Sequence, residues 1–237
     1  MKNSTKEIIN EINTYRDESK AAFLPRFFKT GKGEYGEGDQ FIGVVVPNLR
    51  IVAKKHFDAD FDTLRELLAS PYHEYRLTAL LALTYRYAKL KDHASRETCV
   101  NFYVSQVDAI NNWDLVDLSC YKILGHWLFD KDKQLLYDWA KENHLWKQRI
   151  AMISCMHFVK QGEFKDALAI ADLLQHHPHD FIHKAVGWIL REIGKEDEQL
   201  LVDYLTPRYK EMPRTMLRYA IERFEEEKRK AFLNSTI

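Results

Sequence analysis

Apolar residues recur at helical spacing along most of this chain, and short polar or proline-containing stretches separate the periodic segments. Near the start, Ser4-x-x-Glu7 is a capping-box pattern that precedes apolar residues at helical spacing. It predicts a helix over roughly Thr5 to Lys20. After Pro47 nearly every segment has the pattern of an amphipathic helix, with breaks near Ser70-Pro71, Asn111-Asn112, Asn143-His144, His177-Pro178 and Met212-Pro213. The pattern therefore predicts an all-α fold.

A charged residue follows each break, and we name these five the anchor residues: Arg76, Asp117, Arg149, Lys184 and Arg218. Their intervals are 41, 32, 35 and 34 residues, and each anchor precedes an apolar run of similar character. A two-helix unit of this length is typical of HEAT-like stacking, in which each pair buries its apolar face against the next. We therefore predict a single domain over residues 1–237, a HEAT-like solenoid (an α-α superhelix) with repeats from about residue 48 and a concave basic groove.

The segment from Phe27 to Asp39 holds four of the nine glycines and is the long loop signal of the chain. Within it, Gly31-Lys32-Gly33-Glu34-Tyr35-Gly36 fits the pattern G-x-G-x-x-G. A dinucleotide-binding loop would follow a strand and open a βαβ unit, and neither is predicted here. The match is therefore attributed to chance.

The segment from Phe181 to Lys195 predicts a helix with two stripes. The core stripe consists of Ile182, Ala185, Val186, Ile189 and Ile193, and the polar side carries Lys184, Trp188, Arg191 and Lys195. An aromatic ring flanked by cations suits a surface that meets phosphates and presses against a sugar or base. In the alternative interpretation, Trp188 wedges into a neighbouring repeat and the cations are solvated.

A second candidate group opens the helix predicted after Asn111-Asn112. Trp113 and Asp117 are four residues apart and therefore share a face, while Asp114 fits an acid that complements the helix dipole. Asp117 fits that role less well, because it occupies an anchor position where other repeats carry a cation. Arg149 takes the same position one repeat later, so we expect it beside Asp117, where it would keep the carboxylate ionised.

The composition excludes several classes of function. Thirty-five basic and 35 acidic residues cancel, so any basic patch must be local. Three scattered cysteines indicate neither a disulfide framework nor a zinc site, and the histidines around Pro178 fit surface residues better than metal ligands. No signal peptide or membrane-spanning run is present. We expect a cytoplasmic protein that uses no metal or cofactor.

Three segments in register give the chain a resemblance to the AlkD family of bacterial DNA alkylation repair glycosylases, which are HEAT-like solenoids. The segments are Trp113-Asp114-x-Val116-Asp117, Leu145-Trp146-x-Gln148-Arg149 and Lys184-Ala185-x-Gly187-Trp188-x-Leu190-Arg191-Glu192. At the level of motifs the resemblance covers about Ser70 to Phe224. It implies excision of N3-methyladenine and N7-methylguanine from duplex DNA by hydrolysis of the N-glycosidic bond, without a deep base-flipping pocket.

The resemblance also implies roles for individual residues. Trp113, Asp117 and Trp188 correspond to the family's catalytic triplet, and Arg149 to its DNA-contacting arginine; Lys184, Arg191 and Arg218 are expected to hold phosphates. Phe27 stands where an active-site tyrosine aligns, so a hydroxyl contact is missing there. The expected partner is alkylated double-stranded DNA, bound by a monomer near the nucleoid without an obligatory protein partner or membrane. Two alternatives stay open: a non-catalytic DNA- or protein-binding scaffold, and a glycosylase for bulkier lesions.

Overall fold

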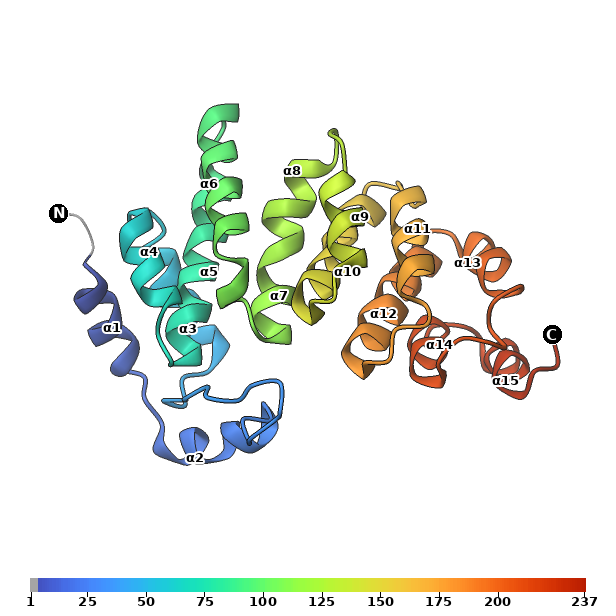
Figure 1. The fold of residues 1–237 in the computed structure, drawn as a ribbon, viewed down its shortest axis with the longest axis horizontal. Helices are drawn as coiled ribbons and strands as arrows, with labels where there is room; N and C mark the ends of the chain where they lie inside the picture. Colours follow the sequence, from blue (N-terminus) through green and yellow to red (C-terminus); the bar gives the residue numbers. More distant parts are fainter. Residues whose placement is uncertain (1–3) are drawn as a thin grey trace. The chain divides into compact units, whose positions relative to one another are not determined.

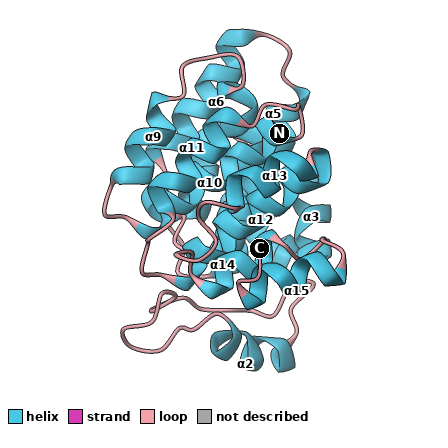
Figure 2. Cartoon of the chain, turned by 90° about the vertical axis from the view of Figure 1, so that its right-hand side faces the viewer, coloured by secondary structure: helices cyan, strands magenta, loops and turns pink. Residues whose placement is uncertain are grey.

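The regular structure of this protein is helical. The structure is a computed structural model that describes residues 4–237, and Figure 2 shows helices joined by loops and turns over that range. One isolated bridge pairs Gln40 with Tyr72. The prediction of an all-α fold is confirmed. Contacts between Cα atoms divide the chain into two compact units, Met1–Ile123 and Leu124–Ile237.

The first unit is built around α5 (His73–Lys89), in which every residue from His73 to Thr84 is buried. A helix that is buried on all sides needs neighbours on all sides, and α3, α4, α6 and α7 supply them (Figure 1). The remaining elements of this unit are α1 (Thr5–Asn13), α2 (Glu18–Phe27), α3 (Val46–Lys55), α4 (Phe61–Leu68), α6 (His93–Ser105), the 3-10 helix η1 (Val107–Ala109) and α7 (Trp113–Cys120).

The second unit is built around α10 (Leu145–Val159), which is buried from Gln148 to Met156. It packs against α9 and α12, and α12 packs in turn against α14 (Figure 1). A π-helix, η2 (Tyr121–Gly125), contains the point in the sequence where this unit begins. The other helices are α8 (His126–Leu128), α9 (Gln134–Lys141), α11 (Lys165–Leu174), α12 (Asp180–Glu196), α13 (Glu198–Leu205), α14 (Arg214–Ala220) and α15 (Glu226–Asn234).

The repeat register predicted from the anchor residues matches the helices. Arg76 is the fourth residue of α5, and the other four anchors are each the fifth residue of their helix, in α7, α10, α12 and α14. All five predicted breaks fall between helices. Equivalent positions of successive repeats therefore carry the anchors.

The helix predicted over roughly Thr5 to Lys20 is wrong in extent. The capping box of Ser4 and Glu7 is present, but α1 ends at Asn13. A second helix begins at Glu18, because the side chain of Asp17 accepts a hydrogen bond from the backbone of Lys20 and caps it. Local capping therefore outcompetes continuation of the first helix.

Repeat packing in the second unit depends on a close approach of α12 and α14. The predicted core stripe of α12 is fully buried, from Ile182 to Ile193. Beside it, a Cβ atom added to Gly187 would lie 2.5 Å from the carbonyl oxygen of Met216. Gly187 therefore lets the two backbones meet at a distance that any side chain would increase.

No helix among residues 4–237 combines the length and apolar character needed to cross a membrane. The three cysteines, Cys99, Cys120 and Cys155, are free and buried, which confirms that they form no disulfide framework. A single domain over residues 1–237 stays a prediction.

Candidate functional site

The first turn of α7 presents the predicted catalytic pair to solvent. Asn112 caps the helix, and its side-chain oxygen accepts a hydrogen bond from the backbone nitrogen of Trp113 at 2.8 Å. Trp113 and Asp117 are each partly exposed, whereas Leu115 and Val116 between them are buried. The shared face predicted from their spacing is therefore the open face of α7.

An aromatic cluster surrounds Trp113 within the first unit. Its ring stacks on Phe28 with centroids 5.6 Å apart and meets the edge of Phe27 at 6.2 Å. Phe28 is buried and stacks in turn on Phe41. Phe27, the last residue of α2, is 52% exposed. The structure thus brings two predicted site residues, Phe27 and Trp113, into contact.

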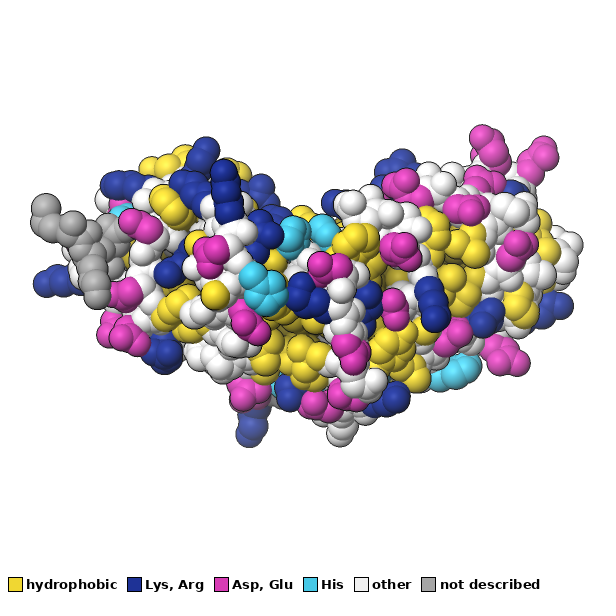
Figure 3. Space-filling model, turned by 90° about the horizontal axis from the view of Figure 1, so that it is seen from above, with side chains coloured by type: hydrophobic (Ala, Val, Ile, Leu, Met, Phe, Trp, Pro, Cys, Tyr) yellow, Lys and Arg dark blue, Asp and Glu magenta, His cyan; other side chains and the backbone are white. Residues whose placement is uncertain are grey.

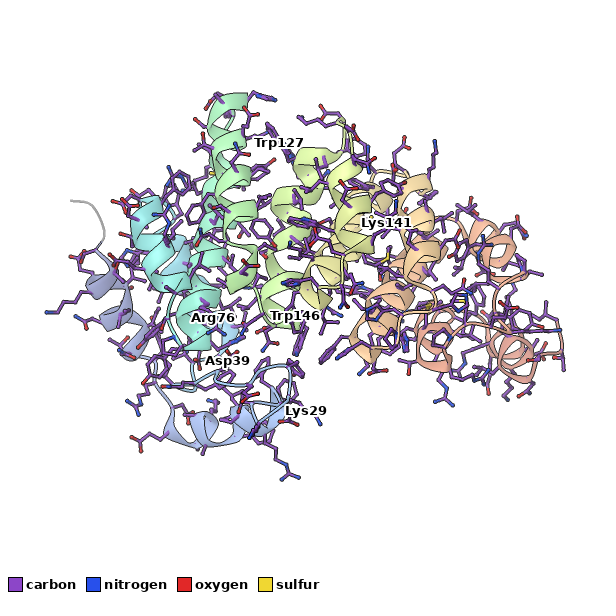
Figure 4. The ribbon with its side chains drawn as sticks, viewed as in Figure 1. Lys29, Asp39, Arg76, Trp127, Lys141 and Trp146 are labelled. Carbon is purple, nitrogen blue, oxygen red and sulfur yellow. The ribbon has the colours of Figure 1, made fainter. Side chains whose placement is uncertain are left out.

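Behind this cluster lies a buried group of charges. His73 pairs with Asp114 at 2.8 Å between Nε2 and Oδ2, and Arg76 pairs with Asp39 at 2.7 Å. Figure 4 shows Asp39 and Arg76 side by side. Asn111 completes the second pair, since it accepts from Arg76 and donates to Asp39. His73 Nδ1 lies 3.5 Å from Asp39 Oδ2, which links the two pairs. The cluster joins α5, the loop before α3, and the start of α7.

Each member of the cluster changes the titration of its neighbours. Burial acts to lower the pKa of His73, but the Asp114 carboxylate and contacts with Asp39 outweigh it and raise that pKa to about 9. Burial acts to raise the pKa of Asp39, yet its contacts with His73 and Arg76 leave that pKa below the usual value. At neutral pH His73 is therefore a buried cation.

Asp114 corrects the sequence interpretation. A simple helix-dipole acid would be exposed, but Asp114 is 5% exposed and hydrogen-bonded to His73. The main role of Asp114 is therefore to form a buried ion pair that fixes the first turn of α7.

The loop after α2 is fastened to the same region by Glu74. One of its carboxylate oxygens accepts hydrogen bonds from the backbone nitrogens of Ile42, Gly43 and Val44, at 2.8 to 3.3 Å. Burial raises the pKa of Glu74 despite these bonds. Neither Glu74 nor His73 was singled out in the sequence, because their partners lie 30 or more positions away.

Three cations missed by the sequence interpretation lie close together along this segment. Arg26 belongs to α2, and Lys29 (labelled in Figure 4) and Lys32 to the loop that follows. All three are exposed, and within residues 4–237 none of them pairs with a carboxylate, in contrast to Lys20, which pairs with Asp17. They were overlooked because they occupy no repeat position.

The polar side of α12 lies in the second unit and is partly exposed, including Trp188. Its cations are paired: Lys184 with Asp180 at 2.6 Å, and Arg191 with Glu192 and Glu222. Trp188 is mostly covered but keeps some exposed surface, and its proposed catalytic role stays a prediction beside the alternative in which it wedges into a neighbouring repeat. Carboxylates therefore neutralise most of the positive charge on this side of α12.

The remaining predicted cations differ in exposure. Arg149 is 5% exposed, donates to the carbonyl oxygen of Phe181 and lies over the Phe181 ring at 5.9 Å. Arg218, on α14, is exposed. The expected Arg149–Asp117 pair stays a prediction, as does the concave basic groove. On the face seen in Figure 3, basic and acidic side chains are interspersed.

The histidines around Pro178 serve local structure. His177 shares a hydrogen bond with Gln148 at 2.9 Å, and the side chain of His179 caps α12. Among the described residues, no group of three or more metal-binding side chains is suitably placed for an ion. These contacts give the histidines a role that needs no metal.

Comparisons with known proteins place the chain among repair proteins. A sequence profile described as "DNA alkylation repair enzyme" matches residues 8–224. The fold is similar to that of a "Predicted DNA alkylation repair enzyme from Enterococcus faecalis", with a TM-score of 0.68 and 14% identity over 89% of this chain and 97% of the other. It is also similar to AlkD2 from Streptococcus mutans, with a TM-score of 0.54 and 16% identity over 88% of this chain and 99% of the other.

No curated protein sequence matches the chain significantly. The solved structures show a shared helical repeat fold, while the profile covers most of the sequence. The resemblance predicted from the three segments is confirmed. The chain belongs to the family of DNA alkylation repair enzymes.

Proposed function

We propose that this protein is a DNA glycosylase that excises cationic alkylated bases, N3-methyladenine and N7-methylguanine, from duplex DNA. The observation that carries the proposal is the position of Asp117. It is an acid at an anchor position, partly exposed on the same face as Trp113, in a chain of the alkylation repair family. The protein would act as a monomer in base excision repair, without a metal or cofactor.

The chemistry needs few groups from the protein. Alkylation at N3 of adenine or N7 of guanine gives the base a positive charge, so the N-glycosidic bond can break without protonation of the leaving group. Asp117 would lie by C1′ of the deoxyribose, where its charge stabilises the developing oxocarbenium ion and orients the attacking water. A deep pocket for a flipped base is not required.

The two tryptophans would hold the sugar. A ring face attracts a developing cation more strongly than a neutral sugar, so this contact strengthens in the transition state. Trp113 has a partly exposed ring supported by Phe28, and Trp188 is partly exposed on α12. Their exposure favours this role over packing in a core.

Phosphate contacts would come from Lys184, Arg191 and Arg218, with Phe27 next to the sugar-phosphate backbone. Arg149 is 5% exposed and donates to the Phe181 carbonyl oxygen, so it would reach a phosphate only with the remaining donors of its guanidinium. Lys184 and Arg191 must exchange their carboxylate partners for phosphates on binding. Each gives up an existing ion pair to form a new one, so its net contribution to DNA affinity is reduced. Arg26, Lys29 and Lys32 need no such exchange. We therefore add these three to the proposed DNA surface.

Replacement of Asp117 by asparagine tests the mechanism. The variant should release N7-methylguanine and N3-methyladenine at least about a hundredfold more slowly, because a preorganised charge at the reacting centre is lost. Binding of undamaged duplex should stay near that of the unchanged protein. The measurement is free base released in single turnover, with duplex binding followed by anisotropy.

Normal release by Asp117→Asn would contradict the mechanism. No release by the unchanged protein, with intact duplex binding, would instead favour the non-catalytic scaffold. Parallel assays on duplexes with methylated and with bulkier alkyl adducts would reveal a glycosylase of different lesion preference. Each alternative thus predicts a separate result.

A further inference from the structure

Two large aromatic side chains of α2 face solvent. Phe23 is 61% exposed and Phe27 is 52% exposed, and their rings stack with centroids 6.3 Å apart and 29° between the ring planes. They are four residues apart and therefore share a face of the helix. Single exposed apolar residues are common on protein surfaces, whereas adjacent ones indicate a surface that binds a partner.

The fold leaves this face of α2 uncovered. No residue of α2 is buried, and the first buried residue after the helix begins is Phe28, which directly follows it. Ala21 and Leu24 lie on the partly covered side of the helix. Figure 1 shows α2 beneath α3, at the edge of the first unit. The two exposed rings therefore contribute little to the core of this unit.

The exposed pair is continuous with the candidate site. Phe27 meets the edge of the Trp113 ring with centroids 6.2 Å apart, and Trp113 is partly exposed on the open face of α7. The three rings form a chain of contacts in which Phe23 lies at the end away from Trp113. We name Phe23 and Phe27 the aromatic platform.

Three cations accompany the aromatic platform, namely the exposed Arg26, Lys29 and Lys32. Arg26 is three residues after Phe23 and therefore lies on the same side of α2. Within residues 4–237 no carboxylate pairs with any of these cations, so an anionic partner would displace no existing ion pair. The surface thus combines apolar rings with cations that can meet an anion.

The glycine-rich loop between Phe28 and Asp39 holds the two lysines beside the platform. Its acids are engaged within the loop, because Glu34 and Glu37 each accept a hydrogen bond from a backbone nitrogen of the loop, at 2.8 and 2.7 Å. The loop is attached at both ends, since Phe28 stacks on Trp113 and Asp39 belongs to the buried charge cluster. The cations are therefore carried by a segment that is fixed to the first unit.

We infer that the aromatic platform binds an unstacked base of the DNA, while the three cations hold phosphates of the same strand. A nucleotide joins a flat ring to an anion, which matches stacked aromatic side chains beside unpaired cations. The contact between Phe27 and Trp113 favours DNA over an anionic membrane as the partner. This inference rests on the proposed function, which puts Trp113 against a deoxyribose.

The platform extends the proposed mechanism without a deep pocket. In an intact duplex each base face is covered by its neighbours, so the rings reach a base only after it leaves the stack. Stacking on an aromatic ring is tolerant of sequence, because every base has a ring face. The platform would therefore stabilise a distorted duplex in any sequence around the lesion.

Phe23→Ala tests the inference at the ring that is farther from Trp113. Affinity is measured by anisotropy for two undamaged probes, a fully paired duplex and the same duplex with one unpaired nucleotide. The unchanged protein should bind the second probe more tightly, because its extra base is already free to leave the stack. Phe23→Ala should weaken binding of that probe by about fivefold to fiftyfold and change the affinity for the paired duplex much less.

Three further variants show whether the ring face is what matters. Phe23→Trp should keep the preference for the unpaired nucleotide, and Phe23→Leu, which is apolar but has no ring face, should lose most of it. Ile51→Ala removes an apolar side chain that is 55% exposed on α3 of the same unit, and it should change neither affinity. Because Phe23 is exposed, circular dichroism should be the same for all variants.

Two results would overturn the inference: no preference of the unchanged protein for the unpaired nucleotide, or full preference in Phe23→Ala or Phe23→Leu. Loss in Phe23→Ala of binding to vesicles of phosphatidylcholine and phosphatidylserine, or of a dimer in sedimentation, with DNA binding unchanged, would also overturn it. Because both probes are undamaged, the proposed function is tested separately. If the protein releases no alkylated base but prefers the unpaired nucleotide through Phe23, the glycosylase proposal fails and the platform stands.

Discussion

At the scale of residues, Asp114 and Asp117 show how one turn of helix separates two kinds of acid. Asp114 is buried and paired with His73, whereas Asp117 is partly exposed. The spacing of Trp113 and Asp117 was enough to predict their shared face. The role of Asp114 was not predictable in the same way, because it depends on His73, 41 positions earlier.

Asp114→Asn should destabilise the protein by about 3–5 kcal/mol, because it removes the closer of the two carboxylates that face the buried His73. Asp117→Asn, at a more exposed position, should cost less than about 1 kcal/mol. The free energy of unfolding in urea, followed by circular dichroism, measures the difference. Equal losses of unfolding free energy in the two variants would show that Asp114 has no greater structural role than Asp117.

The raised pKa of His73 makes stability depend on pH. Protonated His73 is favoured in the folded state, where its pKa is about 9, against about 6.5 in an unfolded chain. Its contribution is therefore fully present below about pH 6.5 and is lost as the pH rises through about 9. By linkage the loss approaches about 3 kcal/mol.

Urea unfolding at a series of pH values from about 6 to 10 measures this slope. His73→Gln should flatten it, and subtraction of the two curves removes contributions from groups that titrate in both proteins. If the free energy of unfolding of His73→Gln still falls with pH in the same way, a group other than His73 is responsible. The comparison needs no knowledge of the activity.

At the scale of elements, α12 carries two neighbouring residues with different surroundings: Gly187 is buried, and Trp188 is partly exposed. Its core stripe and its polar side were predictable, because 3.6-residue periodicity separates them along one helix. The close contact at Gly187 was not, since it depends on the backbone of α14. Likewise, the first helix ended early because Asp17 caps α2. Periodicity identifies faces, whereas caps and close approaches depend on particular partners.

Gly187→Ala and Trp188→Ala should therefore differ in kind. Alanine at 187 gains about 1 kcal/mol in helix propensity, but it must push against a backbone carbonyl, so overpacking at the upper end of about 1–3 kcal/mol should leave a net loss. Trp188→Ala should slow base release and keep the helical signal. Thermal unfolding and single-turnover release measure the two effects. A collapsed helical signal in Trp188→Ala would show that the tryptophan is part of the core.

At the scale of the whole molecule, charge placement matters more than total charge. The formal net charge is zero at pH 7, so long-range attraction to DNA is weak and binding depends on local contacts. The fold class and repeat register were predictable because they follow from repeated amphipathic helices. A role for Arg26, Lys29 and Lys32 was not predictable from the repeats, because these residues occupy no repeat position. They stand out only in the structure, where within residues 4–237 none of the three pairs with a carboxylate.

Lys29→Ala combined with Lys32→Ala should weaken duplex binding and reduce the slope of log affinity against log salt by about 1.8, since each phosphate contact contributes about 0.9. Lys20→Ala is the matched control, because Lys20 is already paired with Asp17, and it should change the slope much less. The measurement is duplex affinity between about 50 and 200 mM salt. An unchanged slope in the double variant would remove this segment from the DNA surface.

The two attachment points of the glycine-rich loop have a consequence for how such a protein can diversify. Phe28 is held by ring stacking and Asp39 by buried ion pairs, so the ten residues between them, 29 to 38, are attached to the unit at both ends. Within this segment, Gly36 is the position where a side chain would meet the backbone of Phe28, so we expect changes at the other positions to disturb α7 least. Under the proposed function, variation in these residues would alter the surface beside Trp113 while the helix that carries Asp117 is kept, so libraries confined to them would test whether they set lesion preference.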